Sequence, residues 1–145
     1  QDARGAARDR LRESRAAGVL PIKERYYAGL ALMDVVKARA AAAQEKVATI
    51  GDPAGEAVYR GLADGYRMAE TALSQALYRG GDPKETLLAA GTDLRHAHQV
   101  LLESMLGRSP TEQEHFERHR KTATLEAVRE TWRLAKTKKV FNRRR

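Results

Sequence analysis

The fold is decided by the stretch GGDPKETLLAAGTDLRHAHQVLLESMLGRSPTE, residues 80–112, which ends one helix, contains a second and begins a third. Asp82 and Ser109 each stand directly before a proline, and this order is typical of an N-cap followed by the first helical residue. Glu85 and Glu112 follow at the three-residue spacing of a capping box. Glycine, which commonly ends helices, lies within two residues before each cap. The stretch therefore predicts that new helices begin near 83 and 110.

The same signals continue outward from this stretch. Gly51-Asp52-Pro53 repeats the Gly-Asp-Pro order of residues 81–83 and predicts another helix start. Apolar residues recur every three or four positions, and we expect four long helices near 21–49, 53–79, 83–106 and 110–136, with a weaker short helix over 2–17. Connections this short make successive helices antiparallel. The predicted fold is an all-α antiparallel bundle with basic terminal extensions.

The length and composition exclude several classes of protein. A chain of 145 residues favours one domain, which we place at 21–136 between extensions at 1–20 and 137–145. The absence of cysteine excludes disulfide scaffolds, thiol nucleophiles, Cys-ligated zinc and iron–sulfur clusters. No apolar run approaches the roughly 20 residues that a membrane-spanning helix needs. We therefore expect one domain that does not span a membrane.

The positive charge is concentrated at the two ends of the sequence. The chain has 27 Lys and Arg against 19 Asp and Glu, a formal charge of +8. Residues 26–110 carry a net −1, whereas residues 1–25 carry +3 and residues 111–145 carry +6. The last 13 residues contain seven cations and no acid. Such a segment cannot be neutralised internally, so it is either solvated or bound to an anionic partner.

The basic C-terminal segment is the strongest functional signal. Its first cations recur at helical spacing, and Trp132 and Phe141 are interleaved with them, a pattern suited to phosphate contact and base stacking. The alternatives are a solvated tail with Trp132 anchored in the core, an acidic protein partner, or anionic lipid. The candidate nucleic-acid-binding residues are Arg129, Arg133, Lys136, Lys138, Lys139, Phe141, Arg143, Arg144 and Arg145, together with Arg8, Arg12 and Arg15.

The other groups of polar and aromatic residues give little indication of a metal, stacking or catalytic site. His115 and His119 are four residues apart and share a helix face with Glu112, which makes them weak metal candidates among several nearby cations. The five tyrosines follow the apolar spacing, so we expect them in the core or at its rim rather than in a stacking platform. No nucleophile–base set or phosphate-binding loop is present. We expect a protein that is not an enzyme and has no cofactor.

A neutral body with cationic ends is typical of a non-enzymatic subunit in a large ribonucleoprotein, such as a ribosome, with RNA or another nucleic acid as partner. One alternative is a peripheral accessory subunit of a respiratory or other membrane complex, and another is a phage or plasmid DNA-binding or packaging protein. We expect an intracellular location. Gln1 in place of Met is compatible with removal of a mitochondrial or other organellar presequence, or with an expression boundary.

Overall fold

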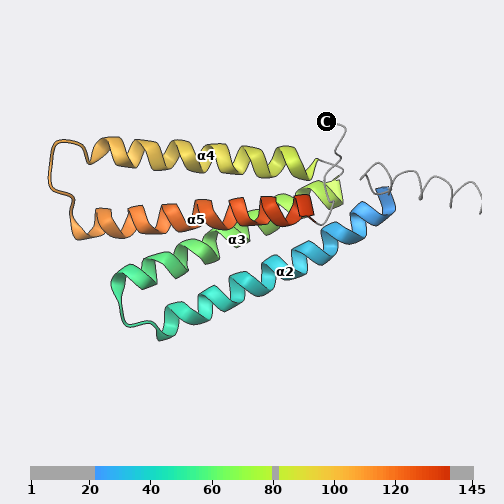
Figure 1. Ribbon diagram of the computed structural model, residues 1–145, viewed down its shortest axis with the longest axis horizontal. Helices are drawn as coiled ribbons and strands as arrows, with labels where there is room; N and C mark the ends of the chain where they lie inside the picture. The colour runs from blue at the N-terminus through green and yellow to red at the C-terminus, as the bar shows by residue number, and fades with distance from the viewer. Residues whose placement is uncertain (1–21, 80–81, 138–145) are drawn as a thin grey trace, which may run out of the picture.

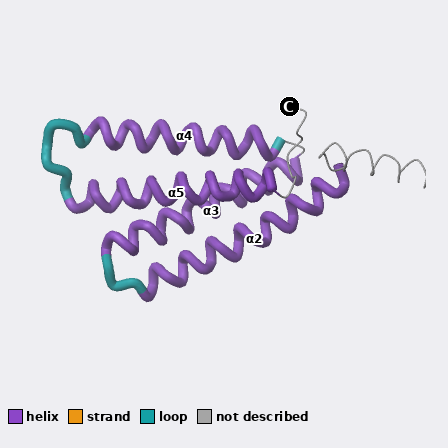
Figure 2. The backbone as a smooth tube through the Cα atoms, viewed as in Figure 1, coloured by secondary structure: helices purple, strands orange, loops and turns teal. Residues whose placement is uncertain are grey.

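The computed structural model describes residues 22–79 and 82–137, and these ranges contain four helices and no strand (Figures 1 and 2). The predicted all-α bundle is confirmed. The expected short helix over 2–17 lies outside the described residues. The helices are α2 (Ile22–Thr49), α3 (Pro53–Arg79), α4 (Pro83–Ser104) and α5 (Glu112–Thr137).

The starts of α3 and α4 follow the prediction. The Asp82 side chain accepts a hydrogen bond from the Lys84 amide at 3.0 Å, and a proline occupies the first turn behind it. The Asp52 side chain accepts one from the Gly55 amide at 3.1 Å. The repeated Gly-Asp-Pro order is therefore one capping solution used twice.

The predicted start of α5 at residue 110 was wrong by two residues. The cap is Thr111 rather than Ser109, because Thr111 Oγ1 accepts from the Glu114 amide at 3.1 Å while Glu114 Oε1 accepts from the Thr111 amide at 3.0 Å. This reciprocal pair is a capping box. Arg108 also binds the Glu114 carboxylate, with Nη1 at 2.6 Å from Oε1, which favours this register over the one that begins at Ser109.

The four helices run alternately up and down, so that α3 and α5 are parallel (Figure 1). These two helices share the largest interface in the described part of the chain, while α2 packs mainly on α3. Helix α4 lies beside α5 and α3 and does not contact α2. The start of α2, the end of α3 and the end of α5 consequently lie at the same end of the bundle (Figure 1).

Two glycines bring α3 and α5 together. A side chain at Gly61 would collide with the backbone carbonyl of Arg120, and one at Gly65 would collide with the carbonyl of Thr124. Both glycines are buried. Because the obstacles are backbone atoms, the close approach of the two helices requires glycine at both positions.

The core lies along α2, α3 and α5. Its largest fully buried side chains include Leu32, Val36 and Leu73, and alanines fill much of the remaining space. Helix α4 contributes less, because Leu87 is buried but Leu94 and Leu101 are only half-buried. Helix α4 is therefore only partly covered by its neighbours.

Candidate nucleic-acid interface

Three of the twelve candidate residues lie in the described part of the chain. Arg129, Arg133 and Lys136 are on α5, and all three are exposed. Their spacing places them on the side of the helix that faces away from the core. The other nine fall outside the described residues: Arg8, Arg12, Arg15, Lys138, Lys139, Phe141, Arg143, Arg144 and Arg145.

The described residues are almost neutral as a group. Residues 22–79 and 82–137 contain 17 Lys and Arg and 16 Asp and Glu, which leaves +1. Residues 1–21 carry a net +2 and residues 138–145 carry +5. Nearly all of the excess positive charge therefore belongs to the two terminal segments rather than to the helices.

Many cations of the bundle are already paired with acids of the bundle. Arg120 of α5 donates to Asp64 of α3 at 2.7 Å, and this pair raises the pKa of the Arg120 guanidinium above its usual value. Arg60 pairs with Glu56 at 2.9 Å within α3. Each pair is partly exposed and contributes only modestly to stability, about 0–1 kcal/mol. Their main consequence is that they reduce the positive potential of the helical body.

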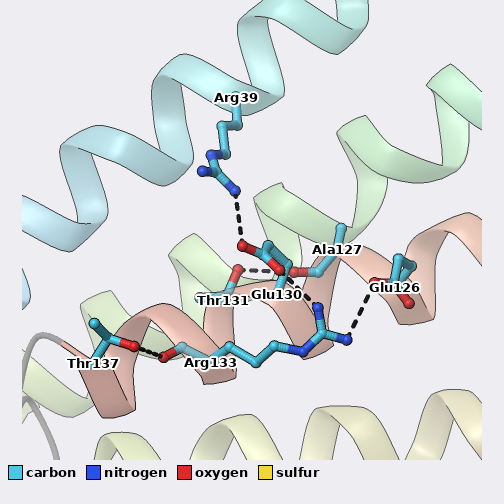
Figure 3. Close-up of polar contacts among 7 residues, drawn as sticks. All are labelled: Arg39, Glu126, Ala127, Glu130, Thr131, Arg133 and Thr137. Atoms are coloured by element: carbon cyan, nitrogen blue, oxygen red, sulfur yellow. Dashed lines mark hydrogen bonds and ion pairs between the residues drawn. The ribbon is translucent and has the colours of Figure 1, made fainter.

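Arg133 belongs to such a network rather than to a free basic stripe (Figure 3). Its Nη1 donates to Glu130 Oε2 at 2.8 Å and its Nη2 donates to Glu126 Oε1 at 3.3 Å. Glu130 also accepts from Arg39 Nη1 of α2 at 3.5 Å. Two of the five N–H donors of the Arg133 guanidinium are already bound to carboxylates of its own helix, so it is the least available of the three described candidates.

Arg129 and Lys136 differ from Arg133. Both are exposed, and within residues 22–79 and 82–137 neither forms an ion pair. They lie seven residues apart, close to two helical turns, so they share one side of α5. Lys136 stands one residue before the end of the helix, after which the sequence continues into the basic segment 138–145. These two exposed cations therefore lie on the stretch of α5 that leads into this segment.

Trp132 is placed against the core. Its side chain is partly buried and packs on the hydrophobic cluster formed by α2, α3 and α5. Of the two roles considered for it, the anchoring role agrees with this packing.

Four of the five tyrosines fall into two groups, and Tyr59 is half-buried. Tyr66 is buried in the core, as predicted. Tyr26, Tyr27 and Tyr78 are exposed rather than buried in the core, and the Tyr26 ring contacts both of the others at the end of the bundle where α2 begins and α3 ends. Helical periodicity did not find this cluster, because residues from α2 and α3 that are distant in sequence form it together.

The histidine pair lies at the opposite end of the bundle. His115 and His119 line a groove of about 470 Å³ together with Asp52, Glu112 and Phe116, where the start of α3 meets the start of α5. No group of three or more His, Asp or Glu side chains in the described ranges is arranged to hold a metal ion. The two histidines therefore remain weak metal candidates.

In the described part of the chain, no helix is both long and apolar enough to cross a bilayer. Comparison with models of protein families, with curated proteins and with solved structures gave no match to this chain.

Proposed function

We propose that the protein is a non-enzymatic helical subunit that binds nucleic-acid phosphates through its basic ends and docks by its bundle in a large ribonucleoprotein assembly. The observation that carries this proposal is the separation of charge. The described bundle has a net charge of +1, whereas the segments on either side of it together hold +7. A polyanion is attracted to such segments whatever its sequence, because each Lys or Arg that reaches a phosphate releases a counterion.

The arrangement of the helices supports the proposal further. The start of α2 and the end of α5 lie at one end of the bundle, so the two basic segments join it on the same side (Figure 1). Arg129 and Lys136 lead along α5 toward that end without acidic partners in the described chain. A single strand of nucleic acid at this end could therefore meet both segments at once.

The test is the salt dependence of RNA binding, measured by fluorescence anisotropy with a labelled single-stranded RNA. We expect a steep fall in affinity with salt for the full chain. Removal of residues 138–145 deletes five cations, and at about 0.7 per phosphate contact the slope should decrease by up to about 3.5. The loss should be similar for all RNA sequences, since phosphate contacts do not read bases.

Arg60→Gln is the matched control, because it removes one cation that already pairs with Glu56 in the bundle. It should leave the slope unchanged. If the shortened chain binds RNA as the full chain does, the basic segment is not the contact. A full chain with no RNA affinity at moderate salt would favour a role in a protein or membrane complex, and a preference for duplex DNA would favour a packaging role.

A further inference from the structure

Three tyrosine rings from two helices meet near the start of α2. The ring centroids of Tyr26 and Tyr27 are 5.9 Å apart with planes at 68°, and those of Tyr26 and Tyr78 are 6.5 Å apart with planes at 80°. Both contacts are of the edge-to-face type that aromatic pairs prefer. Tyr26 is therefore the central ring, in contact with Tyr27 on the same helix and with Tyr78 from the last turn of α3.

These rings are not needed to close the core. Tyr27 is 57% exposed and Tyr78 is 62% exposed, whereas the core residue Tyr66 is 9% exposed. The contact between α2 and α3 in this region is already made by Gly29 and Leu77, since a Cβ at Gly29 would lie 2.7 Å from the Leu77 side chain. The tyrosines lie outside this contact and leave much of their aromatic surface open to solvent.

The cluster lies at the end of the bundle to which both basic segments are attached. Gly61 faces Arg120 and Gly65 faces Thr124, so α3 and α5 pack in parallel with a constant offset of 59 residues. Since both helices rise by about 1.5 Å per residue, Tyr78 is level with Thr137, the last residue of α5. The segment with five cations and no acid begins directly after Thr137.

The charges next to the tyrosines in the sequence are mainly positive, since Lys23 and Arg25 flank Glu24 just before Tyr26. Arg79 follows Tyr78, is exposed, and forms no ion pair within the described ranges. The next acid along the chain, Asp82, uses its side chain to cap α4. The second basic segment, residues 1–21, joins the bundle just before the two tyrosines of α2.

We infer that Tyr26, Tyr27 and Tyr78 form a stacking platform for unpaired bases, and that the nucleic acid held by the basic ends is single-stranded. The inference rests on the proposed function and narrows it. Phosphate contacts alone do not separate a duplex from a single strand. Exposed aromatic rings do, because the bases of a duplex stack on each other, whereas those of a single strand can stack on tyrosine.

The experiment compares three labelled probes with the full chain: an oligothymidine of about 12 nucleotides, an abasic strand of the same length and charge, and a duplex. The wild type should bind the oligothymidine at least about tenfold more tightly than the abasic strand. The double variant Tyr27→Ala/Tyr78→Ala should lose at least about tenfold in affinity for the oligothymidine. Its affinity for the abasic strand and its salt slope should not change.

Two matched variants separate stacking from folding. Tyr27→Phe/Tyr78→Phe keeps both rings and should retain the affinity of the wild type. Tyr59→Ala removes a half-buried tyrosine near the opposite end of α3 and should leave discrimination between oligothymidine and abasic strand intact. Circular dichroism establishes that each variant has the helical content of the wild type before its affinity is measured.

The outcomes distinguish failure of the stacking platform from failure of the proposed function on which it rests. If the wild type binds none of the probes, the proposed function fails and the platform fails with it. If it binds all three with steep salt dependence but equally well, or if the alanine variant binds oligothymidine unchanged, only the platform is overturned. Equal losses on oligothymidine and the abasic strand would also overturn it. The platform would also be overturned if the alanine variant lost binding to a protein partner while its affinities for all three probes stayed unchanged.

Discussion

Helices α3 and α4 both begin after the same Gly-Asp-Pro order, yet α3 is buried in the bundle to a much greater extent than α4. Helix α3 lies between α2 and α5 and buries Gly61, Gly65 and Leu73 along its length. Helix α4 has neighbours on one side only, and its large side chains Leu88 and Val100 are exposed. The difference shows that a cap sequence sets where a helix begins, whereas the neighbours of the helix set how much of it is buried.

The largest expected effect is on the free energy of unfolding, when a leucine is truncated in α3 and, for comparison, in α4. Leu73→Ala removes a fully buried side chain from α3 and should lower the free energy of unfolding by about 2–5 kcal/mol. Leu94→Ala makes the same change on α4, where the side chain is half-buried, and should cost about 1 kcal/mol. Urea unfolding followed by circular dichroism measures both. Equal losses would show that α4 is packed as firmly as α3.

Replacing a glycine with alanine is expected to have a smaller effect on stability, which is destabilising in α3 and stabilising in α4. Gly65→Ala places a methyl group against the backbone of α5 and should destabilise the fold by about 1–3 kcal/mol, because the helices must separate. Gly91→Ala on α4 meets no atom within 4 Å and should stabilise the fold by up to about 1 kcal/mol, since alanine favours the helix. Thermal unfolding of the two variants gives the signs. A stabilised Gly65→Ala variant would contradict the close contact of α3 and α5.

The smallest effect concerns the connection between α4 and α5. Hydrogen bonds from Arg108 and then from the Thr111 amide lower the pKa of Glu114 from 4.5 to about 2. The folded state therefore favours the carboxylate, and the stability that this provides is present above pH 4.5 and is lost as the pH falls toward 2. We expect Glu114→Gln to remove this acid-dependent part of the unfolding free energy.

The matched control for that measurement is Glu112→Gln, which changes another first-turn carboxylate outside the capping box. Unfolding free energies of both variants and of the wild type are measured between pH 2 and 5. An unchanged pH dependence in Glu114→Gln would mean that Arg108 does not hold the carboxylate in solution.

The candidate interface could be predicted only in part. The excess charge at the ends is a property of the sequence, and Arg129 and Lys136 are exposed on α5 as helical spacing indicates. The state of Arg133 could not be read in the same way, because its ion-pair network also includes Arg39 of α2 through Glu130 (Figure 3). A charge count records how many cations a helix has, but not which acids of other helices lie within reach.

By itself, the sequence determined the number, order and approximate ends of the four helices. Caps, prolines and apolar spacing act within a few residues, so they can be read locally. The predicted start of α5 was nevertheless wrong by two positions, because Thr111 rather than Ser109 is the cap. Only the tertiary structure decided that α3 and α5 are the closest neighbours, that α4 is half-covered, and that Tyr26 and Tyr78 meet at the basic end. These features arise where backbones approach across long sequence separations, and no local pattern encodes such distances.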